Sequence, residues 1–101
     1  MEVDLAADNP DVDPIVGRDS VLSALKSSVE GARTVHQVHL PEIEISGDAA
    51  RVQWPVQERV VRDNGTSLVA FGRYDDLWVR SGGEWKLASL RLTNTFLDFG
   101  V

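Results

Sequence analysis

The chain has 101 residues, of which 43% are hydrophobic and 26% are charged, and this predicts one globular domain, residues 1–101, with a single core. Its 16 acidic residues outnumber its 10 basic ones, and the net charge of −6 argues against nucleic acid as a partner. The absence of cysteine excludes disulfides and thiol nucleophiles. The chain has no cationic start followed by an apolar run and no long apolar stretch, which predicts a cytoplasmic protein without a membrane span.

The first third of the chain predicts a short hairpin followed by one helix. MEVDLA (1–6) and PIVG (14–17) are typical of short strands, and DNPDVDP (8–14) between them is typical of a turn-rich loop. Apolar residues at helical spacing in 17–32 predict an amphipathic helix with Asp19 or Ser20 as its N-cap and Gly31 as its stop.

The remainder of the chain predicts four long strands, at about 33–45, 49–61, 66–80 and 84–95. They are separated by SGD, DNG and SGG, the kinds of turn that join antiparallel neighbours. The predicted fold is therefore α+β, a four-stranded antiparallel meander with a short N-terminal hairpin and one main helix.

The turns predict which side chains share a face. Two-residue turns at 47–48, 64–65 and 82–83 place Tyr74 opposite Arg91, and Arg59 opposite His36. The same count gathers six polar or aromatic residues on one face: His36, Tyr74, Asp76, Trp78, Ser89 and Arg91. A three-residue turn or a bulge would reverse every later assignment, and Pro41 is a place where the ladder can break.

His36 and His39 are the two histidines of the chain, and they lie three positions apart on a predicted strand. Their side chains should point to opposite faces, whereas zinc needs convergent ligands, so we expect no metal site. In a flat sheet, His36 would also lie about 13 Å along from the Tyr74 row. Only strong curvature or a bulge would bring these two side chains together.

Two longer stretches carry a family resemblance: TVHQVHLPEIEISGDAARVQW (34–54) and GRYDDLWVRSGGEWKLASLRLT (72–93). Together with the preceding helix, they resemble the SnoaL-like branch of the nuclear transport factor 2-like superfamily over residues 2–97. The resemblance implies a cone fold, in which a bent sheet wraps a pocket. Members of the superfamily include polyketide cyclases, dehydratases and Δ-isomerases, as well as many small proteins with no known activity.

The resemblance also implies roles for particular residues. In dehydratase-like members a histidine on the strand after the helix is the general base, and Thr34-Val35-His36 matches that position. Tyrosine, aspartate and arginine from later strands commonly line the same pocket, which transfers to Tyr74, Asp76 and Arg91. Family domains usually begin with one or two further helices. Because this sequence starts at the first strand, Asp4 or another N-terminal acid would have to replace any donor on those helices.

The leading functional hypothesis is a cofactor-independent lyase or isomerase that acts on a small hydrophobic carbonyl compound. His36 would be the base, Asp76 would orient it and Tyr74 would polarise the carbonyl oxygen. The residues expected to contact the substrate are Arg91, Trp78, Ser89 and Asp4. Three alternatives remain: a non-catalytic module that binds a ligand or dimerises, a truncated vestigial domain, and a pocket in which His36 is merely a satisfied histidine.

One helix cannot cover both faces of a four-stranded sheet, which predicts self-association. The predicted second face carries the apolar residues Val52, Trp54, Val56, Phe71 and Leu90. A partner should cover so large an apolar area, and we expect a homodimer formed through this sheet face.

Overall fold

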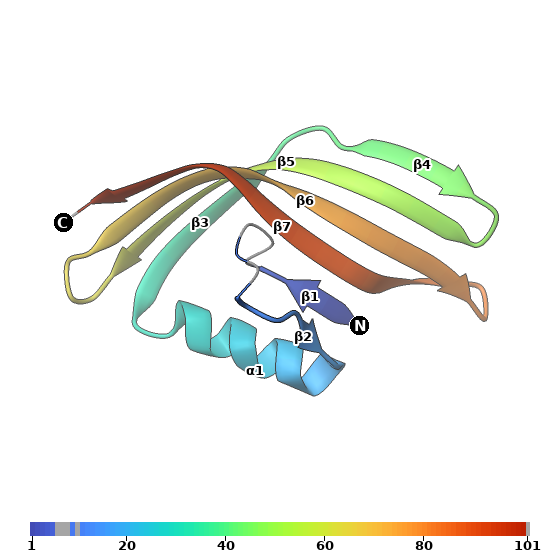
Figure 1. The fold of residues 1–101 in the computed structure, drawn as a ribbon, viewed down its shortest axis with the longest axis horizontal. Coiled ribbons are helices and arrows are strands. Elements are labelled where there is room, and N and C mark those ends of the chain that lie inside the picture. The colour runs from blue at the N-terminus through green and yellow to red at the C-terminus, as the bar shows by residue number, and fades with distance from the viewer. Residues whose placement is uncertain (6–8, 10, 101) are drawn as a thin grey trace.

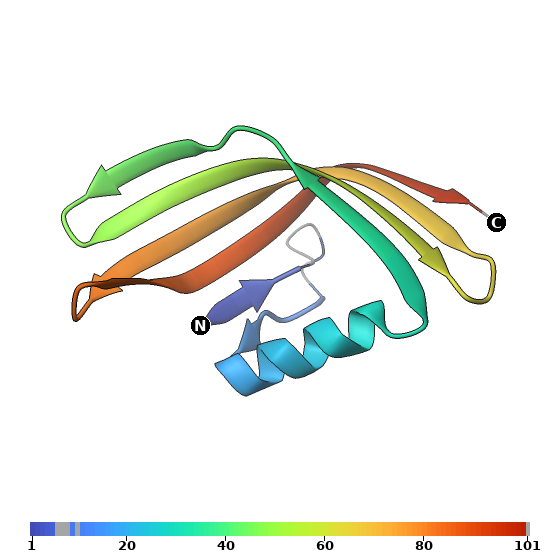
Figure 2. The ribbon, with the colours of Figure 1, turned by 180° about the vertical axis from the view of Figure 1, so that it is seen from behind.

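The computed structural model describes residues 1–5, 9 and 11–100 of the chain. Its elements, in chain order, are β1 (Glu2–Asp4), β2 (Ile15–Val16), α1 (Arg18–Val29), β3 (Ala32–Val38), β4 (Glu42–Ser46), β5 (Ala49–Arg62), β6 (Ser67–Ser81) and β7 (Glu84–Gly100). The sheet bends into an arch, and α1 lies beneath it on the concave side (Figures 1 and 2). The predicted α+β cone with one main helix is confirmed.

Helix α1 begins two or three residues earlier than the sequence predicts. Its N-cap is Gly17, which has a φ of 95° and no capping side chain, so Asp19 and Ser20 lie in the first turn and neither is the cap. Asp19 still places a negative charge near the positive end of the helix dipole. The predicted stop is correct, since Gly31 follows the last turn with a φ of 68°, a conformation that glycine adopts without strain.

The N-terminal hairpin forms as predicted and also extends the main sheet. β1 pairs antiparallel with β2 and parallel with β7, in the register Val3 opposite Leu90. The sheet order is β2-β1-β7-β6-β5-β3, with β4 also on β5. The parallel pair could not be predicted from turns, because it joins segments more than eighty positions apart in the sequence. Residues 8 and 10 of the predicted loop lie outside the described residues.

Besides a bulge at Thr95, three irregularities change the predicted registers. The first predicted long strand is broken into β3 and β4 at residues 39–41, around Pro41. The β5–β6 turn contains three residues, 63–65, because Arg62 pairs with Thr66. A bulge at Ala88 lies between the Leu77–Ser89 and Trp78–Leu87 pairs of β6 and β7. Each irregularity moves the side chains beyond it to the other face of the sheet.

The concave face therefore carries most of the apolar residues of β5 together with Tyr74 and Asp76, contrary to the prediction. Trp54 lies opposite Tyr74, and Val52 lies opposite Asp76. The buried hydrophobic residues of the described chain are Val3, Val21, Ala50, Val52, Val56, Val60, Ala70 and Leu92. Of the five apolar residues predicted on the dimer face, only Phe71 lies on the convex side, where it makes an edge-on contact with Phe96.

Gly72 allows β6 and β7 to approach closely at a second bulge. A β-carbon at this position would lie 2.5 Å from the backbone oxygen of Thr93, which is shorter than atoms tolerate. The bulge itself falls between the Phe71–Phe96 and Gly72–Asn94 pairs. Glycine at this position therefore permits the strand geometry that bends the sheet over the helix.

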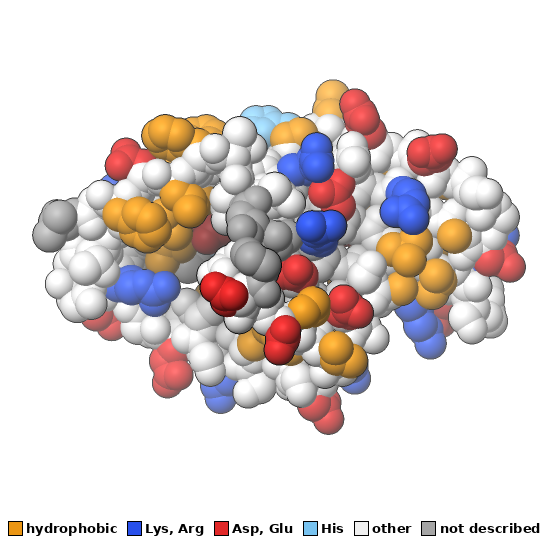
Figure 3. All heavy atoms as spheres, in the orientation of Figure 1, with side chains coloured by type: hydrophobic (Ala, Val, Ile, Leu, Met, Phe, Trp, Pro, Cys, Tyr) orange, Lys and Arg blue, Asp and Glu red, His pale blue; other side chains and the backbone are white. Residues whose placement is uncertain are grey.

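Acidic and basic side chains are interspersed over the surface shown in Figure 3. No helix in the described part of the chain is long and apolar enough to cross a membrane.

Candidate functional site

A cavity of about 280 Å³ lies between helix α1 and the concave face of the sheet. It has polar groups at one side and apolar side chains around them. The described residues that line it are Leu5, Leu25, Ser28, Val29, His36, Glu58, Leu68, Ala70, Tyr74, Leu92, Asn94 and Leu97. Two predicted site residues, His36 and Tyr74, are therefore brought together.

His36 is paired with Glu58 at the open side of this cavity, where 43% of the His36 side chain and 20% of the Glu58 side chain are exposed. The break at 39–41 shifts β3 by one residue, so that His36 lies opposite Glu58 and not opposite Arg59 as predicted. The His36 Nε2 atom is 3.2 Å from the Glu58 Oε2 atom. Glu58, and not Asp76, is thus the carboxylate placed to orient the histidine, and the predicted His36–Asp76 pair is wrong.

Tyr74 is half-buried on the same concave face, opposite Trp54 on β5 and Leu92 on β7. Burial raises the pKa of the Tyr74 phenol, and the negative charges of Glu58 and Asp76 raise it further. The phenol therefore stays protonated at neutral pH and can donate a hydrogen bond. A neutral donor of this kind is suited to polarising a carbonyl oxygen.

The curvature of the sheet is what lets His36 and Tyr74 share a cavity. Glu58 pairs with Ala70, and Tyr74 is four residues further along β6, so the predicted offset along the strand remains. On a flat sheet this offset would separate the two rows by about 13 Å. The sheet arches over α1 (Figure 1), and side chains from both rows line one cavity beneath it.

Asp76 lies on the same face but has a different environment. Its Oδ2 atom accepts hydrogen bonds of 3.2 Å from the indole nitrogens of both Trp54 and Trp78, and its Oδ1 atom is buried without a partner among the described residues. Burial raises the pKa of Asp76, and the two indole hydrogen bonds partly oppose that effect. Neither Asp76 nor Trp78 is among the described residues that line the cavity. Trp78, a predicted substrate contact, donates a hydrogen bond to Asp76 instead.

Three other predicted contact residues lie on the opposite face. The bulge at Ala88 places Arg91 opposite Asp75 and Ser89 opposite Leu77, on the convex side. Asp4 is aligned with Arg91 in the parallel β1–β7 pair, so it points the same way. The expectation that Arg91 and Ser89 share a face with Tyr74 is therefore wrong, although both line a separate hollow together with Asp76. Counting residues outward from the turns does not reveal where a bulge interrupts a strand.

Glu58 is the polar residue of this site that the sequence analysis missed. A signal for it exists in the alternation of β5, because Glu58 occupies a position between Val56 and Val60, both of which face the core. A charged residue at a position that alternation assigns to the buried face indicates a paired or functional group. Asn94 and Ser28 also line the cavity and were not predicted.

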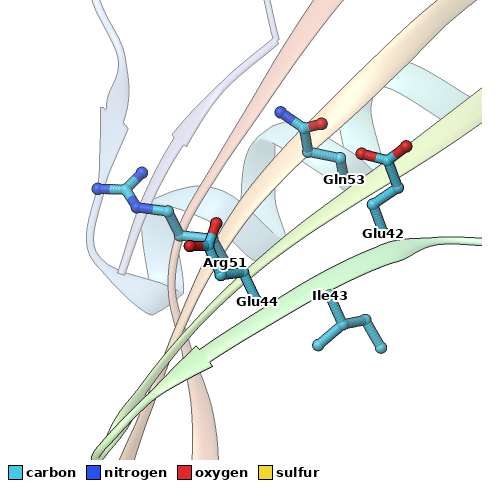
Figure 4. Close-up of a pocket in the computed structure, with 5 residues that line it drawn as sticks. All are labelled: Glu42, Ile43, Glu44, Arg51 and Gln53. Carbon is cyan, nitrogen blue, oxygen red and sulfur yellow. The ribbon is translucent and has the colours of Figure 1, made fainter.

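A second hollow lies at the edge of the sheet where β4 meets β5 (Figure 4). The pairs Glu42–Gln53 and Glu44–Arg51 lie on one side of the two strands, and Ile43 points to the other. All five side chains are exposed, so this hollow offers no sheltered chemistry. Among the residues that the structure describes, no group of three or more histidines or carboxylates is placed to hold a metal ion.

Comparisons with known proteins agree with this architecture. The family model of the SnoaL-like domain matches residues 2–91, which is most of the chain. The chain belongs to the SnoaL-like family. No match is found among curated proteins.

Several solved structures share the fold. The Kfla4162 protein from Kribbella flavida is 22% identical, with a TM-score of 0.84 over 97% of this chain and 71% of its own. A putative scytalone dehydratase from Novosphingobium aromaticivorans is 25% identical, with a TM-score of 0.80 over 96% of this chain and 64% of its own. Hexachlorocyclohexane dehydrochlorinase LinA-type3 from Novosphingobium barchaimii is 16% identical, with a TM-score of 0.81 over 97% of this chain and 67% of its own.

Proposed function

We propose that this SnoaL-like protein is a cofactor-independent lyase or isomerase that transfers a proton on a small hydrophobic carbonyl compound, with His36 as the base. The observation that carries the proposal is the His36–Glu58 pair opening on the same cavity as Tyr74. A base, a group that orients it and a neutral donor are what α-proton abstraction beside a carbonyl requires.

Each of the three side chains has a distinct role in the proposed reaction. The Glu58 carboxylate, 3.2 Å from the His36 Nε2 atom, orients the imidazole, and the other ring nitrogen, Nδ1, serves as the base. Nδ1 removes a proton from the carbon next to the carbonyl, and the electron pair moves onto the carbonyl oxygen. Tyr74 donates a hydrogen bond to that oxygen as its charge develops. The electron pair then re-forms the carbonyl, and either the C=C bond takes the proton at another carbon, or a β-hydroxyl group is expelled and leaves with the proton as water.

The names of two structural relatives support an elimination or isomerisation. One is described as a putative scytalone dehydratase and another as a dehydrochlorinase, and both names denote the removal of a small molecule. The mostly apolar lining around His36 and Tyr74 favours a hydrophobic substrate over a charged one.

A proton-exchange assay tests this proposal. The wild-type protein is incubated in D₂O with a panel of β-hydroxy ketones and β,γ-unsaturated ketones, and NMR follows deuterium at the α-carbon and loss of water. We expect deuterium incorporation into at least one ketone, well above the buffer rate. Binding of the panel in the cavity without exchange into any member would favour the non-catalytic, ligand-binding alternative and reject the proposed reaction.

We also propose that the chain forms a homodimer through its convex sheet face. The exposed apolar residues on that face include Val35 (59% exposed), Phe71 (41%), Val79 (36%) and Phe96 (54%). A self-complementary contact that covers these residues and buries more than about 1,000 Å² would form a stable two-fold dimer.

The Phe96→Glu variant is expected to be monomeric in light scattering at micromolar concentration, because it places a charge beside Phe71 in the proposed contact. Phe99→Glu is the matched control: Phe99 is 72% exposed but is paired with Leu68, whose side chain lies on the concave side. We expect this control to remain dimeric. A monodisperse wild-type monomer would rule out the dimer.

A further inference from the structure

A second cavity, of about 260 Å³, adjoins the one that contains His36. The two cavities share Leu5, Leu25 and Tyr74, so Tyr74 stands at their junction. Apart from Tyr74, only apolar side chains of the described chain line the second cavity, among them Met1, Val3, Val21, Leu22, Leu87 and Leu90. The space under the sheet therefore has a polar lobe and an apolar lobe on either side of one phenol.

The apolar lobe has a closed floor and an open end. Val3 and Val21 are each only 4% exposed and form its floor, whereas Met1 is 44% and Leu22 is 51% exposed. Strand β1 is held beside β7, and α1 packs against the hairpin, so these elements frame the lobe, which His36 does not line. A group that entered the lobe would be surrounded by hydrocarbon without having to displace a polar partner.

From this division we infer that the ligand of the site is a carbonyl compound with an unbranched alkyl tail, bound with the carbonyl at Tyr74 and the tail in the apolar lobe. This inference rests on the proposed function for the position of the carbonyl group. A tail in this lobe gains the hydrophobic effect of each methylene removed from water. A tail longer than the lobe can extend into solvent between Met1 and Leu22. Carbons beyond that length should therefore add no further affinity, but they should not prevent binding.

The chain offers two unique reporters for a direct test, since it contains a single methionine and a single tyrosine. Labelling with ¹³C-methyl methionine gives one resonance from Met1 in the apolar lobe, and 3-fluorotyrosine gives one ¹⁹F resonance from Tyr74 at the junction. The probes are 2-alkanones of about four to about twelve carbons, with affinity expected to rise about fourfold for each added methylene until the lobe is full.

We expect all of these ketones to shift the Tyr74 resonance and only the longer ones to shift the Met1 resonance. Leu22→Glu should abolish the Met1 response and the dependence on tail length, while the shortest ketone still shifts Tyr74. Leu40→Glu is the matched control, because Leu40 is 91% exposed and lies outside the lobe.

The outcomes separate this inference from the proposed reaction. A Tyr74 shift with no Met1 shift for any tail length would overturn the apolar-lobe assignment and leave the proposed reaction intact. An affinity that does not change with tail length would likewise overturn the apolar-lobe assignment and leave the proposed reaction intact. A length-dependent Met1 shift in a protein that exchanges no deuterium would support the ligand class and reject the catalysis. No response at either resonance would overturn the ligand class.

Discussion

Replacing His36 with glutamine is expected to lower the rate of deuterium exchange into the most reactive panel ketone by about 10²–10⁴-fold, the usual contribution of a positioned general base. Glutamine fills a similar volume and can still donate to Glu58, but its amide cannot take up a proton at neutral pH. The variant should therefore stay folded and still bind the ketone, which circular dichroism and ligand titration would show.

His39→Gln is the matched control for this variant. His39 is exposed and is not among the described residues that line either lobe, so the same substitution there should leave the exchange rate unchanged. Equal activity of the two variants would exclude His36 as the base.

Glu58→Gln separates orientation of the histidine from simple structural support. We expect kcat to fall while KM changes little, because Glu58 holds the base and makes no required contact with the ground-state ketone. A variant that loses affinity and stability together, with kcat retained, would show that Glu58 acts only in packing.

Replacing Asp76 with alanine is expected to destabilise the fold by about 2–5 kcal/mol, the largest stability effect we predict. The substitution leaves the Trp54 and Trp78 indole N–H groups without their acceptor, and an unpaired buried donor costs about 1–3 kcal/mol. Asp76→Asn should avoid most of this loss, since its amide oxygen can accept both indole hydrogen bonds. Urea unfolding followed by circular dichroism measures both variants.

The Asp76 carboxyl also predicts a pH dependence of stability. Its pKa in the folded protein is raised by burial, so the folded state binds its proton more tightly than the unfolded state does. Its contribution to stability is fully present below the unfolded pKa of about 3.9 and is lost as the pH rises through the folded pKa. The free energy of unfolding of wild type, minus that of Asp76→Asn, should therefore decrease as the pH is raised from about 4.

Asp98→Asn removes one negative charge at an exposed position and controls for the change in net charge. A difference between wild type and Asp76→Asn that stays constant or increases with pH would contradict the assignment of a raised pKa to the Asp76 carboxyl.

His36 and its carboxylate partner differ in how far the sequence predicts them. The position of His36 is predictable, because Thr34-Val35-His36 follows a well-marked helix and begins a strand. The partner of His36 is not predictable from turn lengths, since a break around Pro41 shifts the pairing by a single residue and replaces Arg59 with Glu58. Such a shift changes which face each side chain occupies without changing any strand boundary by more than a few residues.

The sequence by itself determines the α+β composition, the single helix, the positions of the strands and turns, and the SnoaL-like family. All of these depend on local periodicity, glycine-containing turns or motifs that lie close together in the chain. Only the tertiary structure decides which side chains share the cavity. The bulge at Ala88 turns Arg91 and Ser89 away from Tyr74, and the parallel pairing of β1 with β7 creates the apolar lobe. Bulges and long-range strand pairs depend on how the whole sheet curves over α1, and that curvature is a property of the packed chain and of no single segment.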